Sequence, residues 1–404
     1  MKRLLLLMVL LTTVCFSFAQ VKNVKEAKSA AGGTTPDFKK AEDLIGKALI
    51  DPTTKDDPNT WNIAGYVQKK INEKEMENAY LKKSYDTLKS YNSILNMYHY
   101  FLKCDDLAQI PDAKGKIKNK FRKDNLVQLL IERPNLINGG IIYFNKSNDK
   151  KALEFFATYI DAASHPMFES QNFLVMDTII PQVAYFASLA AMRMEDYPSI
   201  IKYALYGEDD QETGKLVLEY LAIAYKAQND TIQWIDVLQK GAKKHPDHPF
   251  FYGHLIDYYS NHSQYEEAMK IADDMLKIYP MNAFYLYVKG YLCHNTKDYD
   301  NAIEFYKKTI EVNADYAEAY SNLGLIYCLK AQEYTEQSTT VDIKSTQYKE
   351  EQAIIKKFYE EAKPYYEKAR LLKPDQTELW LQGLYRIYYN LNMGKEFDEI
   401  EKLM

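Results

Sequence analysis

The histidines near residue 250 are the side chains best suited by type to bind a metal ion. His245 and His248 are three residues apart, and His254 and His262 follow soon after. Imidazole is a common ligand of zinc and other transition metals. However, a Pro-Asp pair separates the first two histidines and predicts a turn, where polar residues are routine. We therefore expect a turn at this point and no metal site.

The sequence contains none of the signatures that would indicate an enzyme. It has no glycine-rich phosphate loop, no CxxC, no HExxH and no serine in a nucleophile-elbow context. The formal net charge is -5, which disfavours nucleic acid as a partner because phosphate binding needs a basic face. The basic run from Lys114 to Lys123 could bind an anion, but such a run is more often a solvated face. We predict a non-catalytic protein without a cofactor.

The N-terminus has the pattern of a secretory leader. Lys2 and Arg3 give a basic start, an apolar run follows, and Ser-Phe-Ala ending at Ala19 forms a small-x-small cleavage site. Lipidation at Cys15 is not favoured, because a lipobox has a small residue where Val14 stands. We expect export, to the periplasm in preference to release or surface display. No other stretch is apolar enough to span a membrane.

Three cysteines remain once the leader is removed: Cys104, Cys293 and Cys328. An odd number leaves at least one thiol free. Cys293 and Cys328 occupy nearly equivalent places on neighbouring predicted helices. The axes of packed helices lie roughly 8–10 Å apart, which is long for a disulfide. We expect the cysteines to be small buried apolar side chains.

Small and aromatic residues recur at fixed spacing between residues 282 and 324. Gly290, Ala302 and Tyr306 lie at offsets of 0, 12 and 16, and Gly324 lies at an offset of 34. Apolar residues at helical spacing flank a polar turn, which predicts a pair of amphipathic helices. A period of this length is typical of stacked helix–turn–helix units. This segment resembles the tetratricopeptide repeat family. The resemblance implies an all-α, right-handed superhelical solenoid of antiparallel helix pairs.

The same offsets recur elsewhere, loosely before residue 215 and more specifically from about 249 to 380. After Gly324 the expected second helix arrives about 26 residues late, which predicts an insertion near residues 333–358 that is polar at first and then helical. Insertions in repeat proteins often lie on the binding face, although this one could be a passive loop. The residues predicted to pack repeats together are Gly140, Ala152, Phe156, Ala268, Gly290, Ala302, Tyr306, Gly324, Ala362, Tyr366 and Trp380.

These features divide the chain into segments. The leader occupies residues 1–19, and the small, polar stretch 20–35 predicts a flexible lead-in. A degenerate helical part covers residues 36–133 and includes a predicted long helix from Asn78 to Cys104. Residues 134–404 form the repeat-like part.

In the resembled family the first helix of each repeat lines a concave groove that holds extended peptides. The resemblance therefore implies that these helices carry the partner-binding side chains. The candidates in this chain are Phe284, Tyr287, Tyr291, His294, Asp257, Asn261, Tyr385 and Tyr388. Exposed aromatic residues in a groove would anchor a peptide. The alternative is that these rings pack between helices, as most aromatic stripes do.

Two functional hypotheses follow. The first is an exported scaffold that binds a protein or peptide in the bacterial cell envelope. The second is a carbohydrate- or nutrient-binding accessory protein, since tyrosine and tryptophan rings are large and amphipathic and the chain has 35 tyrosines. The sequence alone leaves the partner and the oligomeric state open.

Overall fold

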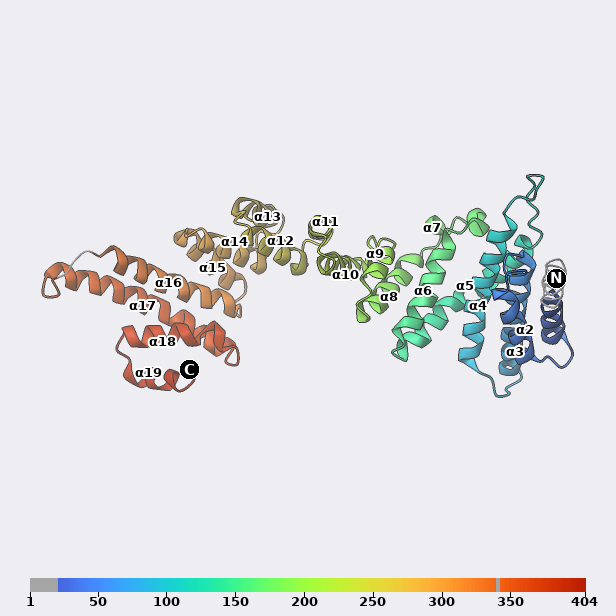
Figure 1. Ribbon diagram of the computed structural model, residues 1–404. Helices are drawn as coiled ribbons and strands as arrows, with labels where there is room; N and C mark the ends of the chain where they lie inside the picture. Colours follow the sequence, from blue (N-terminus) through green and yellow to red (C-terminus); the bar gives the residue numbers. More distant parts are fainter. Residues whose placement is uncertain (1–20, 339–341) are drawn as a thin grey trace, which may run out of the picture. The chain divides into compact units, whose positions relative to one another are not determined.

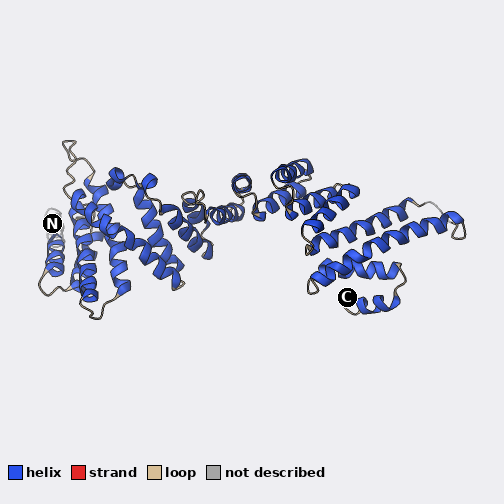
Figure 2. Cartoon of the chain, turned by 180° about the vertical axis from the view of Figure 1, so that it is seen from behind, coloured by secondary structure: helices blue, strands red, loops and turns tan. Residues whose placement is uncertain are grey.

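The regular structure of this chain is helical. A computed structural model describes residues 21–338 and 342–404, and within these residues all regular elements are helices (Figures 1 and 2). The prediction of an all-α fold is confirmed. The predicted leader, including Cys15, lies outside the described residues. No helix in the described ranges has both the length and the apolar run needed to cross a bilayer.

The chain divides into two compact units, 1–237 and 238–404. The boundary falls inside α11 (Thr231–Lys244). The first unit contains a helix at residues 21–32, then α2 (Phe38–Ile50), α3 (Pro58–Tyr80), α4 (Thr87–Ala108), α5 (Arg122–Asn145), α6 (Asp149–Ala163), the 3-10 helix η1 (Pro166–Gln171), α7 (Phe173–Met176), α8 (Ile180–Arg193), α9 (Tyr197–Ala204) and α10 (Gly214–Ala227). The second unit contains α12 (Pro249–Asn261), α13 (Tyr265–Ile278), α14 (Ala283–Asn295), α15 (Tyr299–Val312), α16 (Ala317–Gln337), α17 (Thr346–Leu372), the 3-10 helix η2 (Thr377–Leu379), α18 (Leu381–Asn390) and α19 (Gly394–Glu401).

The tight turns inside the helix pairs share one backbone motif, seen clearly between α14 and α15. Lys297 has a left-handed φ of 61°, and its N–H donates to the carbonyl of His294 (3.0 Å). The N–H of Asp298 donates to the carbonyl of Cys293 (2.8 Å), which completes a Schellman motif. The Asp298 side chain then caps α15. The first helix of several other pairs also ends with a left-handed residue, namely Ser147, Glu195, Asn229, Ser263 and Asn392.

An aromatic ring on the second helix of a pair packs on a glycine of the first helix. A Cβ on Gly290 would lie 2.8 Å from the ring of Tyr306, and one on Gly140 would lie 2.3 Å from the ring of Phe156. Only glycine permits this close approach. The contact occurs at the same place in both pairs, so the glycine and the ring have the same spacing in the chain. The structure buries all the residues for which we predicted a packing role: Gly140, Ala152, Phe156, Ala268, Gly290, Ala302, Tyr306, Gly324, Ala362, Tyr366 and Trp380.

The predicted insertion lengthens two helices. Gly324 packs on the ring of Tyr366, as Gly290 packs on the ring of Tyr306. More residues separate Gly324 from Tyr366 than separate Gly290 from Tyr306, and the difference equals the predicted length of the insertion. Most of the inserted residues extend the end of α16 and the beginning of α17 (Figure 1). Residues 339–341, between the two helices, lie outside the described residues.

The stretch predicted to be a flexible lead-in is helical from residue 21 to residue 32, so the prediction of flexibility is wrong there. Val24, Ala27 and Ala31 are buried in one cluster with Ala41 and Ile63. Their spacing of three and four residues places them on one helical face. These small side chains allow the helix to pack closely. The polar composition of the stretch as a whole gave no indication of a buried helix.

Two other predicted boundaries in the first unit are displaced. The predicted helix from Asn78 to Cys104 is interrupted, because α3 ends at Tyr80 and α4 begins at Thr87. Asp86 sets the new start, since its side chain accepts a hydrogen bond from the N–H of Lys89 (3.0 Å). The predicted division at residues 133 and 134 falls inside α5, which continues through a proline. The compact units divide at 237 and 238 instead.

The three cysteines of the described chain are free and buried, as expected. Burial raises the pKa of Cys104 to about 12 and that of Cys328 to about 12, and it also raises the pKa of Cys293. Thiolate, the reactive form, is therefore scarce at neutral pH.

We accordingly expect all three thiols to react with a disulfide-exchange dye such as DTNB at least about 100-fold more slowly in the folded protein than in denaturant. The measurement is the rate of dye release at pH 8, with and without guanidinium chloride. A thiol that reacts as fast in the folded chain as in the unfolded chain would contradict the buried placement.

Candidate functional site

Tyr287, the central residue of the predicted groove, is engaged in packing. Its ring lies near the rings of Tyr306 and Tyr316, with centroid separations of 5.6 and 5.0 Å. Its hydroxyl accepts a hydrogen bond from Nδ2 of Asn322 (3.0 Å). Burial raises the pKa of Tyr287, so the hydroxyl stays protonated at neutral pH. This side chain therefore joins α14 to α15 and α16.

The other candidates on α14 are partly accessible. Phe284, Tyr291 and His294 are half-buried. The ring of His294 packs edge-on against Tyr299, at a centroid separation of 6.3 Å. Burial lowers the pKa of His294, so its imidazole is neutral at pH 7. These three side chains leave only part of their surface for a partner.

The candidates on α12 and α18 do not extend this stripe as an aromatic surface. Asp257 and Asn261 are exposed at the end of α12. On α18, Tyr385 is half-buried, and Tyr388 is buried with its hydroxyl donating to Glu367 (3.1 Å). Of these four candidates, the two on α12 are therefore exposed polar residues and the two on α18 are half-buried or buried rings.

The second unit has an apolar groove within its first helices, between residues 239 and 278. The groove has a volume of about 440 Å³ and lies where α11 and α13 flank α12. From α12 it receives Tyr252 and Leu255, and from α13 it receives Ile271, Met275 and Ile278. The side chain of Ile278 is 59% exposed, although it is apolar. A surface of this kind is typical of a protein contact.

Charged residues of both signs border the apolar groove. Lys243 and Lys270 lie beside Glu267 and Asp274, so the border has no net charge. The hydroxyl of Tyr252 donates to a backbone carbonyl of α11 (2.6 Å), so its polar atom is already satisfied. The groove can therefore accept apolar side chains without leaving this buried polar group unpaired.

The apolar groove was not predicted from the sequence, because the resemblance implies binding by the first helix of each pair. A signal was present, since Ile271, Met275 and Ile278 follow the i, i+4, i+7 spacing of one helical face. That spacing alone does not distinguish a face packed on another helix from a face left open. The groove lined by α11, α12 and α13 shows that this face is left open.

The histidines considered as metal ligands lie near this groove. His245 and His248 are in the turn between α11 and α12. In the part of the chain that the structure describes, no three His, Cys, Asp or Glu side chains are grouped as metal ligands would be.

Comparison with protein families identifies the centre of the second unit. Residues 290–330 match the family model described as TPR repeat. The chain contains a tetratricopeptide repeat. The match covers α15 and parts of α14 and α16, and it includes Gly290, Tyr306 and Gly324, the residues on which the resemblance was based. The tetratricopeptide repeat is thus confirmed at the point where the spacing is clearest.

Several solved structures of repeat proteins resemble parts of the chain. MamA from Desulfovibrio magneticus is 15% identical, covers 49% of this chain and 97% of its own, and has a TM-score of 0.34. The C-terminal part of a TPR repeat-containing protein from Cytophaga hutchinsonii is 14% identical, covers 66% and 93%, and has a TM-score of 0.42. A TPR repeats protein from Bacteroides fragilis is 17% identical, covers 67% and 99%, and has a TM-score of 0.32. These scores are all below 0.5, so the assignment rests on the repeat match and the helices themselves. No curated protein matches the chain.

Proposed function

We propose that this protein is a non-catalytic, exported scaffold that binds a protein partner in the bacterial cell envelope. The observation that carries the proposal is the apolar groove between α11, α12 and α13. It lies in the same unit as the tetratricopeptide repeat. Repeats of this type create extended surfaces suited to binding other chains.

The partner presents an apolar helix or strand segment to the groove. Met275 and Ile278 are on the same side of α13, so they can contact successive apolar side chains of an amphipathic segment. The border of the groove suits a segment that has charges of both signs beside its apolar face. This border contains Lys243, Lys270, Glu267 and Asp274. In our proposal the apolar groove is the main binding surface, in place of the predicted aromatic side chains on α14.

Export is the second component of the proposal, and the leader pattern at residues 1–19 supports it. Mass spectrometry of the protein isolated from its native host should give an N-terminus at Gln20. An N-terminus at Met1 would remove the envelope from the proposal and leave the groove unaffected.

We expect charge inserted into the groove to abolish partner binding. In the double variant Met275→Glu, Ile278→Glu, two carboxylates would have to be desolvated under the bound segment, so affinity should fall by about 100-fold or more. The measurement is quantitative capture from a cell-envelope extract on immobilised Gln20–Met404, followed by titration of the recovered protein.

Met281→Glu provides a matched control, because Met281 is 72% exposed in the same unit and does not line the groove. It should bind the partner as the parent does. The groove is wrong as the site if the double variant keeps the parent's affinity while circular dichroism shows both variants folded. The scaffold hypothesis itself fails if the parent recovers no specific protein.

A further inference from the structure

The first unit has a second, chemically different cavity. It has a volume of about 410 Å³ and lies between α3 and the beginning of α5. Aromatic rings of Tyr66, Phe101 and Phe121 contribute to its lining. This volume is within the range of small-molecule sites, about 300–1,000 Å³. Nothing in the proposed scaffold function uses this cavity.

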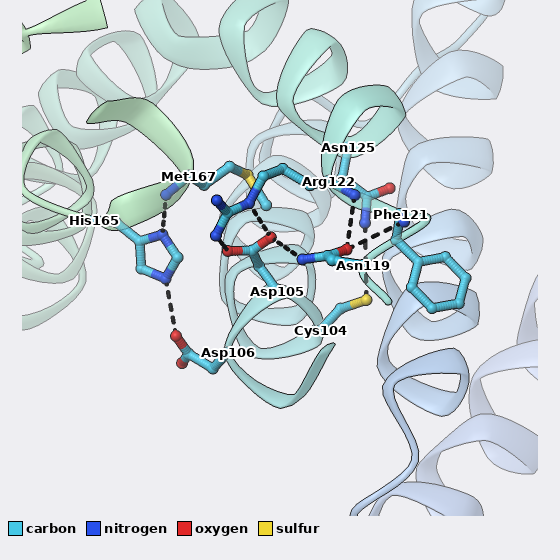
Figure 3. Close-up of polar contacts among 9 residues, drawn as sticks. All are labelled: Cys104, Asp105, Asp106, Asn119, Phe121, Arg122, Asn125, His165 and Met167. Carbon is cyan, nitrogen blue, oxygen red and sulfur yellow. Dashed lines mark hydrogen bonds and ion pairs between the residues drawn. The ribbon is translucent and has the colours of Figure 1, made fainter. Parts of the chain in front are cut away.

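A buried carboxylate holds one wall of the cavity in place (Figure 3). Asp105 is 1% exposed and accepts two hydrogen bonds from Arg122, at 2.8 Å from Nε and 2.6 Å from Nη2. It also accepts one from Nδ2 of Asn119 (2.6 Å). Asn119 Oδ1 in turn accepts from the backbone N–H of Phe121 (3.2 Å). A bidentate, charge-assisted pair of this kind fixes local geometry.

The same cluster orients the residues that face the cavity. In Figure 3 the ring of Phe121 points away from Asp105. Asn125 is 5% exposed, and its Nδ2 donates to Oδ1 of Asn62 (3.1 Å), another lining residue. Two amides of the lining are therefore held in place before any ligand arrives, which reduces the entropy lost on binding.

Polar groups of opposite character remain available in the lining. Lys120 and Asp124 each contribute to the cavity, and across residues 21–338 and 342–404 neither forms an ion pair. The amide of Gln128 adds one donor and one acceptor group. The cavity thus offers an ammonium donor, a carboxylate acceptor and amides beside aromatic rings.

This combination favours a ligand whose groups both donate and accept hydrogen bonds. A simple anion would suit Lys120 but would be repelled by Asp124, and an apolar chain would leave both charges desolvated. A sugar hydroxyl both donates and accepts, so hydroxyls on one ring can satisfy Asp124 and Lys120 together. The ammonium of Lys120 lies 5.2 Å from the centroid of the Phe121 ring, and the C–H face of the same sugar ring can take its place there. We propose that this cavity binds a saccharide of one or two rings.

The test uses the whole mature chain and saturation-transfer NMR. The probes are glucose, galactose, N-acetylglucosamine, glucuronate, maltose and cellobiose, each titrated to obtain a Kd. We expect at least one neutral sugar to bind. Phe121→Ala and Asp124→Asn should each weaken that binding by about tenfold or more, because one removes the ring and the other the charged acceptor.

Lys118→Ala is the matched control, since Lys118 is an exposed residue of the same loop that pairs with Asp112 and does not line the cavity. It should bind like the parent, and so should Met275→Glu, Ile278→Glu. Asp124→Asn keeps the test decisive if Phe121→Ala fails to fold. The proposal is overturned if no neutral sugar binds, if only glucuronate binds, or if both cavity variants retain the parent's Kd.

Discussion

Replacing Tyr306 by alanine should lower the free energy of unfolding of the second unit by about 3–5 kcal/mol. Tyr306 is fully buried, and its ring packs directly on Gly290. Its hydroxyl also accepts a hydrogen bond from Nδ2 of Asn322 (3.2 Å) on the next helix. The substitution would open a cavity at the junction of α14, α15 and α16. Urea denaturation, with hydrogen exchange of these helices as a local readout, measures the effect.

Two controls separate packing from a general effect of removing tyrosine. Tyr306→Phe keeps the ring and loses one hydrogen bond, so it should cost only about 1 kcal/mol. Tyr389→Ala removes the same atoms at a position that is 68% exposed, and it should cost less than about 1 kcal/mol. If Tyr306→Ala costs no more than Tyr389→Ala, the ring does not stabilise the repeat as the structure indicates.

Replacing Arg133 by glutamine should destabilise the first unit by about 3–5 kcal/mol at pH 7. The guanidinium lies over the rings of Tyr159 (3.7 Å) and Phe173 (4.1 Å) and pairs with Asp177 (2.8 Å). Only 6% of the Arg133 side chain and 11% of the Asp177 side chain are exposed. The variant would leave a carboxylate buried without its cation, which is the costly outcome for a buried pair.

The pH dependence identifies this mechanism. Burial by itself would raise the pKa of Asp177, but hydrogen bonds from Arg133 and Tyr159 outweigh burial and hold the pKa below its usual value. The parent therefore keeps this stabilisation above the unfolded pKa, near 4, and loses it as the pH falls further. In Arg133→Gln burial is no longer opposed by the guanidinium, so Asp177 takes up a proton at a higher pH. The difference in stability should thus be smaller at pH 4.5 than at pH 7.

Arg193→Gln is the matched control for this prediction. Arg193 pairs with Asp149 at 3.3 Å, but 43% of its side chain is exposed, so water screens the pair. Its loss should cost at most about 1 kcal/mol and should show little change between the two pH values. Equal costs for the two arginine variants, measured by urea denaturation, would contradict a special role for the buried pair.

The sequence by itself determined the local part of this fold. Gly290 and Tyr306 lie in one helix pair, so their spacing in the chain directly records their contact in space. The turn at Lys297 and Asp298 is equally local, because its hydrogen bonds span only a few residues. These contacts join residues that are close in the sequence and recur at a fixed spacing. The helix pairs, the tetratricopeptide repeat and the length of the insertion could therefore be predicted.

Only the tertiary structure decided which apolar and polar faces remain open. Tyr287 and Ile278 both lie on regular helical stripes, yet Tyr287 packs between helices whereas Ile278 is left 59% exposed in a groove. In the first unit, Asp105 meets Arg122 and Asn119 across a loop, and Asn119 accepts a hydrogen bond from the backbone N–H of Phe121. Exposure depends on whether a neighbouring helix covers a face, and that depends on contacts between residues far apart in the chain. Periodicity records the direction of a side chain on its own helix and contains no information on what lies opposite.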